Sequence, residues 1–269
     1  MTGAVSGLIG STKSSLSTTG GTVWNTGVSG YNGVYFTSNG TFTILNGTRD
    51  IEVLVISGGS GGGGGAFMNY GVLSGGGGGA AGNRNSTTIS NAAPGSYTIT
   101  VGAGGAGGGR GISNNVNVPA TGLQGGTGGT SSIVTPASVT YSATGPTGGG
   151  GGYQYYYGSK FGGTGASNSN FSGTAGFSGT QYNGGGGGAG AGSNASAIGT
   201  YYIGALGGSA TTINNLTFGY GAQGGNWNER NNSTFVDGSG GAGGAGANDV
   251  TFGPGYTGYR GAVYLRWKV

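Results

Sequence analysis

GGSGGGGG at residues 58–65 is the first of ten short glycine tracts that recur, interrupted by Ala, Ser or Thr, almost to the end of the chain. The other nine tracts lie at 75–82, 102–109, 122–129, 145–152, 162–165, 184–192, 204–208, 219–225 and 238–246. Segments of ordinary composition separate the tracts. Because a flexible linker joins two parts of a protein once, ten short tracts are too many to be linkers. Because glycine has no Cβ, backbones made of it can approach one another very closely. The pattern predicts tracts that pack side by side.

Each tract is expected to form an extended left-handed helix with three residues per turn. Such helices contain no internal hydrogen bonds, whereas buried N–H and C=O groups are almost always paired. The amides must then bond laterally to neighbouring tracts, as in polyglycine II, and an eight-residue tract would span roughly 25 Å. The alternative is a disordered low-complexity chain. The aromatic and β-branched residues between the tracts favour the ordered bundle.

Composition excludes several classes of function. The chain has 269 residues, of which 75 are Gly, 33% are hydrophobic and only 5% are charged. It has no Cys and no His, which excludes disulfides, thiolate chemistry, histidine general bases and the usual zinc sites. We therefore expect neither a metal nor a cofactor. The net charge of +4 comes from scattered basic residues, so we expect no nucleic-acid partner. The sequence also predicts neither a signal peptide nor membrane insertion, because it has no long apolar run.

Strand patterns frame the glycine region. Residues 34–56 alternate in polarity around Asn39-Gly40 and Asn46-Gly47, which predicts two or three antiparallel strands. Further strands are predicted at 96–101, at 133–141, where Pro136 interrupts the pattern, and at 262–269. The expected fold is mostly non-helical: a bundle of polyglycine II helices with a small antiparallel β-sheet that gathers both termini at one end. Residues 1–33 are predicted to be an N-terminal attachment arm, and residues 34–269 a glycine-rich domain with tracts and loops over 58–261.

The direction in which each tract runs decides at which end of the bundle the next connecting segment lies. If adjacent tracts run antiparallel, their connections fall alternately at the strand end and at the far end of the bundle. The connections assigned to the far end are 66–74, 110–121, 153–161, 193–203 and 226–237. Those assigned to the strand end are 83–101, 130–144, 166–183, 209–218 and 247–252. The far-end set is rich in Tyr and Asn, whereas the strand-end set contains the Thr-, Ser-, Ile- and Val-rich segments.

The far-end segments are the candidate recognition site. Tyr and Trp together with Asn, Ser and Gly are the composition of antibody loops, and recognition usually lies on loops that a rigid scaffold presents. The candidate residues are Phe67, Met68, Asn69, Tyr70, Tyr153, Tyr155, Tyr156, Tyr157, Lys160, Tyr201, Tyr202, Trp227, Asn228 and Arg230. The alternative is that these aromatic side chains only cover the end of the bundle. The density of hydroxyl groups at 153–157 favours recognition.

Four framing stretches resemble a known family. FTSNGTFTI at 36–44, IEVLVISGGSGGGGG at 51–65, SYTITVGAGGAGG at 96–108 and GAVYLRWKV at 261–269 look like the glycine-rich domain of bacteriophage tail-fibre proteins. The alternation of tracts and loops is similar to the adhesins at the tips of the long tail fibres of T-even-like phages. The resemblance covers residues 34–269. It implies a polyglycine II sandwich in the virion, made in the host cytoplasm and fixed at one end to a tail-fibre protein. Its distal loops would bind a bacterial outer-membrane protein or lipopolysaccharide.

Two other classes of function fit the sequence less well. Glu229 and Asp237, beside Arg230, form the one plausible carboxylate pair for a glycosidase, but nothing else in the sequence indicates an enzyme. The G-x-G-x-x-G pattern at Gly102, Gly104 and Gly107 is not followed by a helical period, so it does not predict dinucleotide binding. A structural or ice-binding glycine-rich protein is the alternative to an adhesin, and it would show a strict Gly-x-x period.

Overall fold

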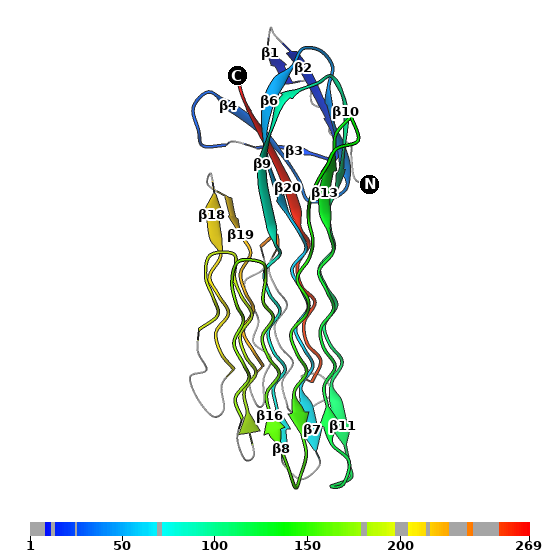
Figure 1. Ribbon diagram of the computed structural model, residues 1–269, viewed down its shortest axis with the longest axis vertical. Coiled ribbons are helices and arrows are strands. Elements are labelled where there is room, and N and C mark those ends of the chain that lie inside the picture. The colour runs from blue at the N-terminus through cyan, green and yellow to red at the C-terminus, as the bar shows by residue number, and fades with distance from the viewer. Residues whose placement is uncertain are drawn as a thin grey trace.

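The computed structural model describes residues 9–11, 14–24, 26–68, 72–178, 182–196, 204–213, 216–225, 236–238 and 253–269. Within these ranges the regular elements are all β-strands, which confirms the predicted non-helical fold. Figure 1 shows an elongated molecule with a pair of β-sheets at one end, called here the proximal end, and short strands at the other, the distal end. Long extended segments connect the two ends.

Two sheets make up the proximal end. The six-stranded sheet has the order β1 (Ile9–Ser11), β2 (Ser14–Thr19), β5 (Gly40–Ile44), β10 (Gly95–Thr100), β13 (Ser131–Val134) and β14 (Thr140–Ala143). The five-stranded sheet has the order β3 (Thr22–Trp24), β4 (Tyr31–Phe36), β20 (Ala262–Lys268), β6 (Arg49–Ile56) and β9 (Arg84–Ala92). The strands predicted at 34–56, 96–101, 133–141 and 262–269 are therefore present, with slightly shifted bounds.

The two proximal sheets enclose an apolar core. Alternate residues of each strand face inward because successive side chains point to opposite faces, and Val34, Phe36, Phe42 and Tyr97 are all buried there. Trp267 of β20 packs on Phe42 with ring centroids 5.5 Å apart. The predicted single small sheet is thus a two-layer sandwich.

Residues assigned to an N-terminal arm contribute to both layers of this sandwich. Strand β2 pairs with β5 in the six-stranded sheet, and β3 pairs with β4 in the five-stranded sheet. Strand β9 was not predicted, because its Ser- and Thr-rich alternation faces solvent on one side and buries few apolar residues. The expected boundary at residue 33 is therefore not a structural boundary.

The glycine tracts bond to one another with a three-residue repeat. Gly58, Gly61 and Gly64 donate their N–H groups to the carbonyls of Gly129, Gly126 and Leu123. The next residues along, Gly59, Gly62 and Gly65, donate to Tyr259, Tyr256 and Gly253. The third set, Ser60 and Gly63, donates to Ala80 and Gly77. Successive residues of one tract thus bond to three different neighbours.

Burial follows the same three-residue repeat. In tract 102–109, Gly102, Gly105 and Gly108 are buried while Ala103 and Ala106 are exposed. Tracts 58–65, 75–82 and 184–190 are buried throughout and form the centre of the bundle. A Cβ built on Gly63 would overlap the carbonyl oxygen of Gly150. Only glycine permits this separation between neighbouring backbones.

The direction of the first six tracts agrees with the alternation predicted from sequence. Tract 102–109 runs parallel to 58–65, since Gly105 and Gly108 donate to Gly59 and Gly62. Tract 122–129 runs antiparallel to 58–65, as the falling partner numbers above show. Segments 66–74, 110–121 and 153–161 therefore lie at the distal end, as predicted.

The predicted direction of tract 184–192 was wrong. Residues 172–178 form an extra extended segment antiparallel to 162–165, because Gly162 and Gly165 donate to Phe177 and Thr174. Tract 184–192 consequently runs parallel to 75–82, with Gly78 and Ala81 donating to Gly186 and Ala189. Segment 166–183, predicted at the strand end, therefore spans the bundle.

Tract 184–192 ends at the proximal end, so the segment after it starts there and not at the distal end. Ser193 lies beside Ser209, whose N–H bonds to its hydroxyl. Residues 197–203 lie outside the described residues. Segment 193–203 therefore begins at the end opposite to the one predicted.

Two further corrections concern the last part of the chain. Residues 253–261 form a tract antiparallel to 102–109, with Gly255 and Gly258 donating to Gly108 and Gly105. This tract starts at the distal end, where Gly253 accepts from Gly65, although the segment before it, 247–252, was predicted at the strand end. Gly238 bonds to Gly82 and Arg260 beside the sandwich, although tract 238–246 was predicted to start at the distal end. The rest of predicted tract 238–246 lies outside the described residues.

Short strands close the bundle. The distal strands are β7 (Ala66–Met68), β8 (Val72–Ser74), β11 (Gly111–Ser113), β12 (Ala120–Thr121), β15 (Tyr153–Gln154), β16 (Lys160–Phe161) and β17 (Tyr182–Asn183). A separate hairpin of β18 (Thr211–Ile213) and β19 (Leu216–Phe218) stands beside the sandwich (Figure 1). Segment 209–218 is thus at the strand end, as predicted.

Candidate functional site

The distal strands form two small sheets that inherit the directions of the tracts. One has the order β11-β7-β8-β17 and the other β12-β15-β16. Strands β7 and β11 pair in parallel because their tracts run in the same direction, whereas β15 and β16 form an antiparallel hairpin. Each turn beyond these strands is therefore held at the end of a rigid bundle.

The β15–β16 hairpin presents most of the described tyrosines at this end. Tyr153 and Phe161 face each other across it with stacked rings, 4.9 Å between centroids. In the turn, Tyr157 meets Tyr156 edge to face at 4.9 Å and Tyr155 at 6.5 Å. Tyr157 is 69% exposed and Tyr156 is 38% exposed, whereas Tyr155 is half-buried. The edge-to-face contacts hold two hydroxylated rings in solvent without burying them.

A buried polar group supports this hairpin from below. Gln154 is fully buried and its amide donates to the hydroxyl of Ser74 at the end of β8. That hydroxyl donates in turn to the carbonyl of Tyr153 at 3.2 Å, and it also accepts from Asn183 of β17 at 3.4 Å. Three chain segments far apart in sequence thus meet under the tyrosine turn. Truncation of an exposed tyrosine leaves these contacts intact.

Two predicted contact residues are part of the interior. Met68 is fully buried with Ala66 and Ala120, and Phe67 is only 7% exposed. Both follow directly from the central tract 58–65, so their side chains fill the space beneath the distal turns. Their assignment to the recognition site is therefore corrected to a packing role.

A second turn adds exposed apolar side chains that the candidate list did not include. In the turn after β11, the hydroxyl of Ser113 donates to Val118 at 2.7 Å and Val118 donates its N–H to Asn115. Ile112 is 49% exposed, Val118 50% and Phe161 42%. We call the set of exposed large side chains at this end the distal tip surface: Ile112, Val118, Tyr156, Tyr157 and Phe161. Both turns were assigned to this end from sequence, but which of their side chains reach solvent was not evident.

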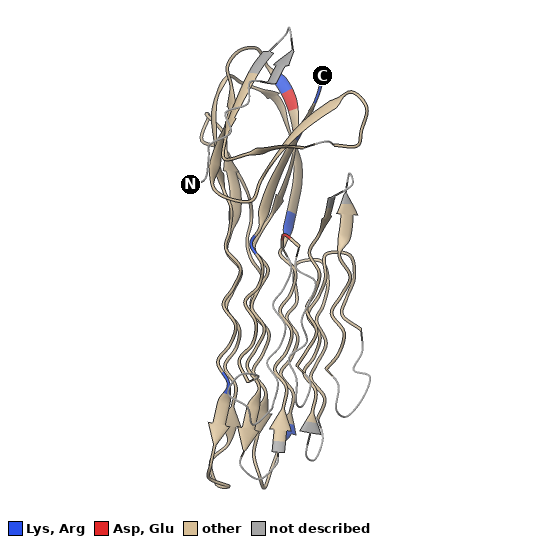
Figure 2. Cartoon of the chain, turned by 180° about the vertical axis from the view of Figure 1, so that it is seen from behind, with Lys and Arg blue, Asp and Glu red and all other residues tan. Residues whose placement is uncertain are grey.

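The charge of the described distal segments is positive. Arg110 immediately precedes β11 and Lys160 begins β16, and the described distal segments contain no Asp or Glu. Figure 2 shows the acidic positions of the described residues toward the proximal half of the molecule. The aliphatic part of Arg110 passes over Gly253, where a Cβ would meet its carbon atoms.

Seven predicted site residues cannot be placed. Asn69, Tyr70, Tyr201, Tyr202, Trp227, Asn228 and Arg230 lie outside the described residues. Of the predicted set, the structure brings together Tyr153, Tyr155, Tyr156, Tyr157 and Lys160 on one hairpin.

The carboxylate considered for catalysis lies far from the distal end. Asp237 accepts the N–H of Arg260 at 3.4 Å and the hydroxyl of Tyr264 at 3.5 Å, beside the sandwich. Burial raises the pKa of Asp237 above its ordinary value, against the opposing effect of Arg260. Burial and the nearby Asp237 charge also raise the pKa of Tyr264. The assignment of Asp237 to a distal loop was therefore wrong, and Glu229 lies outside the described residues.

The described residues provide neither a metal site nor a membrane-spanning helix. Among the described residues there is no group of three or more His, Cys, Asp or Glu side chains that could hold a metal ion. No helix in the described part of the chain is long and apolar enough to cross a membrane.

Comparison with known proteins places the sequence in one group. A family model described as a glycine-rich domain matches residues 35–268, which is nearly the whole chain. A comparison with curated proteins gave no significant match.

Proposed function

The chain belongs to the glycine-rich domain family, and we propose that it is the receptor-binding tip of a bacteriophage tail fibre. In this proposal the proximal sandwich joins a tail-fibre protein of the virion. The distal tip surface binds an outer-membrane protein or lipopolysaccharide on the bacterium. The glycine tracts are polyglycine II helices that hold the two ends apart.

The three-residue repeat supports the polyglycine II assignment. A helix with three residues per turn directs residues i, i+1 and i+2 toward three different neighbours and makes no internal hydrogen bond. The bonds from Gly58, Gly59 and Ser60 go to three separate segments, and burial in tract 102–109 has the same period. Such a bundle is stiff, because each tract is bonded along its length on several sides.

The observation that carries the proposed function is the exposed tyrosine turn at the free end of this bundle. Tyr156 is 38% exposed and Tyr157 is 69% exposed in this turn. The polar side chains that support the hairpin, Ser74 and Gln154, are buried beneath it. Rigid aromatic side chains give a large contact area at low entropic cost, and such residues commonly dominate binding interfaces.

Positive charge at the distal end favours an anionic cell surface. Arg110 and Lys160 lie there. Charges of this kind raise the association rate with an oppositely charged partner more than they raise affinity. Their contribution falls as salt shortens the Debye length from about 10 Å at 0.1 M.

The test is binding of the labelled chain to a panel of Gram-negative strains, measured by flow cytometry. For a strain that binds the parent, Tyr156→Ala with Tyr157→Ala should weaken binding roughly thirtyfold or more, equivalent to about 2 kcal/mol. The matched control is Tyr259→Ala, which removes a tyrosine that is 36% exposed on the side of the bundle. Unchanged binding by the double variant, or an equal loss in the control, would count against the distal tip surface.

A further inference from the structure

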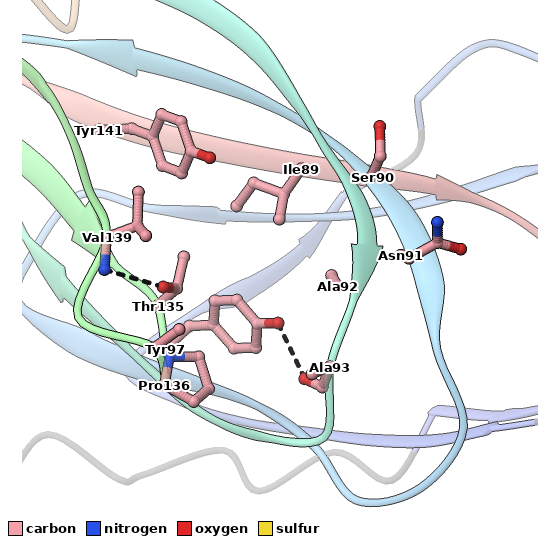
Figure 3. Close-up of a pocket in the computed structure, with 11 residues that line it drawn as sticks. Ile89, Ser90, Asn91, Ala92, Ala93, Tyr97, Thr135, Pro136, Val139 and Tyr141 are labelled. Atoms are coloured by element: carbon pink, nitrogen blue, oxygen red, sulfur yellow. Dashed lines mark hydrogen bonds between the residues drawn. The ribbon is translucent and has the colours of Figure 1, made fainter.

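A pocket opens at the outer end of the proximal sandwich, the end opposite to the distal tip surface. Its volume is about 220 Å³, and its walls come from the β9–β10 turn and the β13–β14 turn (Figure 3). Strand β9 runs away from the bundle, since it follows tract 75–82, so its last residue Ala92 lies at the end of the molecule. The pocket is therefore accessible to whatever approaches the sandwich along the long axis.

The walls of the pocket are uncharged and mostly apolar. Ile89, Ala92, Pro136 and Val139 supply apolar surface. Four residues in the walls carry a hydroxyl group, and the hydroxyls of Tyr97 and Thr135 already have partners. The hydroxyl of Tyr97 donates to the carbonyl of Ala93 at 2.8 Å, and the hydroxyl of Thr135 accepts the N–H of Val139 at 3.1 Å (Figure 3).

Two unusual backbone conformations frame the pocket. Asn91 has φ 49° and Ser138 has φ 62°, and they are the non-glycine residues with positive φ in the described part of the chain. Asn91 lines the pocket, and Ser138 lies between the lining residues Ala137 and Val139. The side chain of Asp50 holds Asn91 by accepting its N–H at 2.8 Å. Backbone strain of this kind is concentrated at binding sites and persists only where the surroundings enforce it.

Val139 is an additional sign that this end contacts another molecule. Its side chain is 47% exposed although it lines the pocket mouth. An apolar pocket with an apolar rim lowers its free energy when an apolar group displaces water from it.

We propose that this pocket receives one uncharged apolar side chain, between leucine and tryptophan in size, from the protein that carries this domain. The volume is below the range of roughly 300–1,000 Å³ that drug-sized ligands occupy. A charged group would lose its hydration without gaining a partner, because no charged residue lines the walls. A sugar would find two of the four wall hydroxyls, those of Tyr97 and Thr135, already engaged. That the carrier is the partner rests on the proposed function, which makes the proximal end the attached end.

The test is a methyl NMR titration of the whole chain with side-chain analogues. Toluene and indole represent apolar side chains, n-butylammonium represents a charged one, and glucose represents a glycan. We expect toluene and indole to shift the methyl signals of Val139 and Ala92 saturably, and the other two probes to leave them unshifted. No saturable shift with the apolar probes, or a preference for glucose or n-butylammonium, would overturn the proposal.

Matched variants separate the pocket from the rest of the sheet. Ala137→Trp fills the pocket from its exposed turn and should weaken toluene binding at least tenfold. Ser96→Trp places the same side chain on the neighbouring strand β10, at a solvent-exposed position one residue before Tyr97, and should bind toluene like the parent. Equal binding by the two variants would overturn the proposal. Should Ala137→Trp not fold, Val139→Asp is expected to give the same loss.

Two further measurements distinguish the carrier protein from other occupants. Sedimentation velocity of the parent chain should show no self-association through the pocket. If the parent self-associates and Ala137→Trp abolishes that association, the occupant is a second copy of the chain and the proposal is wrong. Ala137→Trp should also keep the cell binding of the isolated chain, because the distal tip surface is untouched. The double variant Tyr156→Ala with Tyr157→Ala should lose cell binding but still bind toluene. That result would show that the two sites are separate. Failure of the parent to bind any strain would refute the proposed function alone.

Discussion

Replacement of Gly63 by Ala tests whether close backbone contact holds the bundle together. Gly63 lies in the central tract 58–65, and a Cβ there would overlap the carbonyl oxygen and carbon of Gly150. The neighbouring backbones would have to separate. Gly63 donates to Gly77 at 2.8 Å and Gly77 donates to Gly150 at 2.8 Å, so separation weakens a continuous pair of buried hydrogen bonds.

The expected destabilisation follows from two contributions. Overpacking of a dense interior costs about 1–3 kcal/mol, and one buried amide group left without its partner costs about 1–3 kcal/mol more. The sum of about 2–6 kcal/mol is a large part of the 5–15 kcal/mol that typically separates folded from unfolded proteins. Gly63→Ala should therefore be barely stable or insoluble.

Gly109→Ala is the matched control because it makes the same chemical change in another tract. A Cβ at Gly109 would meet only the side chain of Leu123, at 3.4 Å, which is an ordinary contact. Since alanine lowers the entropy of the unfolded chain, this variant should be neutral or stabilised by about 0.4–1 kcal/mol. Urea unfolding followed by tryptophan fluorescence gives both free energies, with Trp267 in the core as a probe. Equal stability of the two variants would refute the close-contact explanation.

Two other predictions concern the bundle and its junction with the sandwich. Amide hydrogen exchange should be slow at Gly185, Gly186 and Gly188, whose N–H groups donate to two neighbouring tracts; exchange at the rate of an unfolded peptide would contradict an ordered bundle. Burial raises the folded-state pKa of Asp237, so its protonated form favours folding at low pH, and this contribution is lost as pH rises through the raised pKa. Asp237→Asn should consequently show a smaller loss of stability than the parent between pH 3 and pH 7 in urea unfolding, and identical pH profiles would speak against this role.

The positions of most strands and glycine tracts could be predicted because their patterns are local. The sequence does not predict two of the tracts, because a segment with a three-residue repeat needs glycine only where it faces a neighbouring backbone. In segment 172–178, Gly173 and Gly176 face backbone carbonyls while Thr174 and Ala175 lie between them. In segment 253–261, Gly255 and Gly258 do the same. A search for glycine at every third residue would have found both.

The candidate site could be predicted only at the level of segments. Composition identified the tyrosine-rich segment 153–161, and the alternation of tracts assigned it to the distal end. Composition does not tell which apolar side chains lie above or below the closing hairpins. Composition therefore predicts Phe67 and Met68 as contact residues although they are buried, and it does not predict Ile112 and Val118 although they are exposed.

Hydroxyl-radical footprinting of the chain bound to bacterial cells tests the proposed recognition surface most directly, because it reports protection without any substitution. The oxidised fraction of each tyrosine is compared between the free and the cell-bound chain by mass spectrometry. Tyr156 and Tyr157 should be protected on binding, while Tyr259 on the side of the bundle, 36% exposed in the free chain, should be oxidised equally in both states. Protection of Tyr259 with Tyr156 and Tyr157 unchanged would contradict recognition through the distal tip surface.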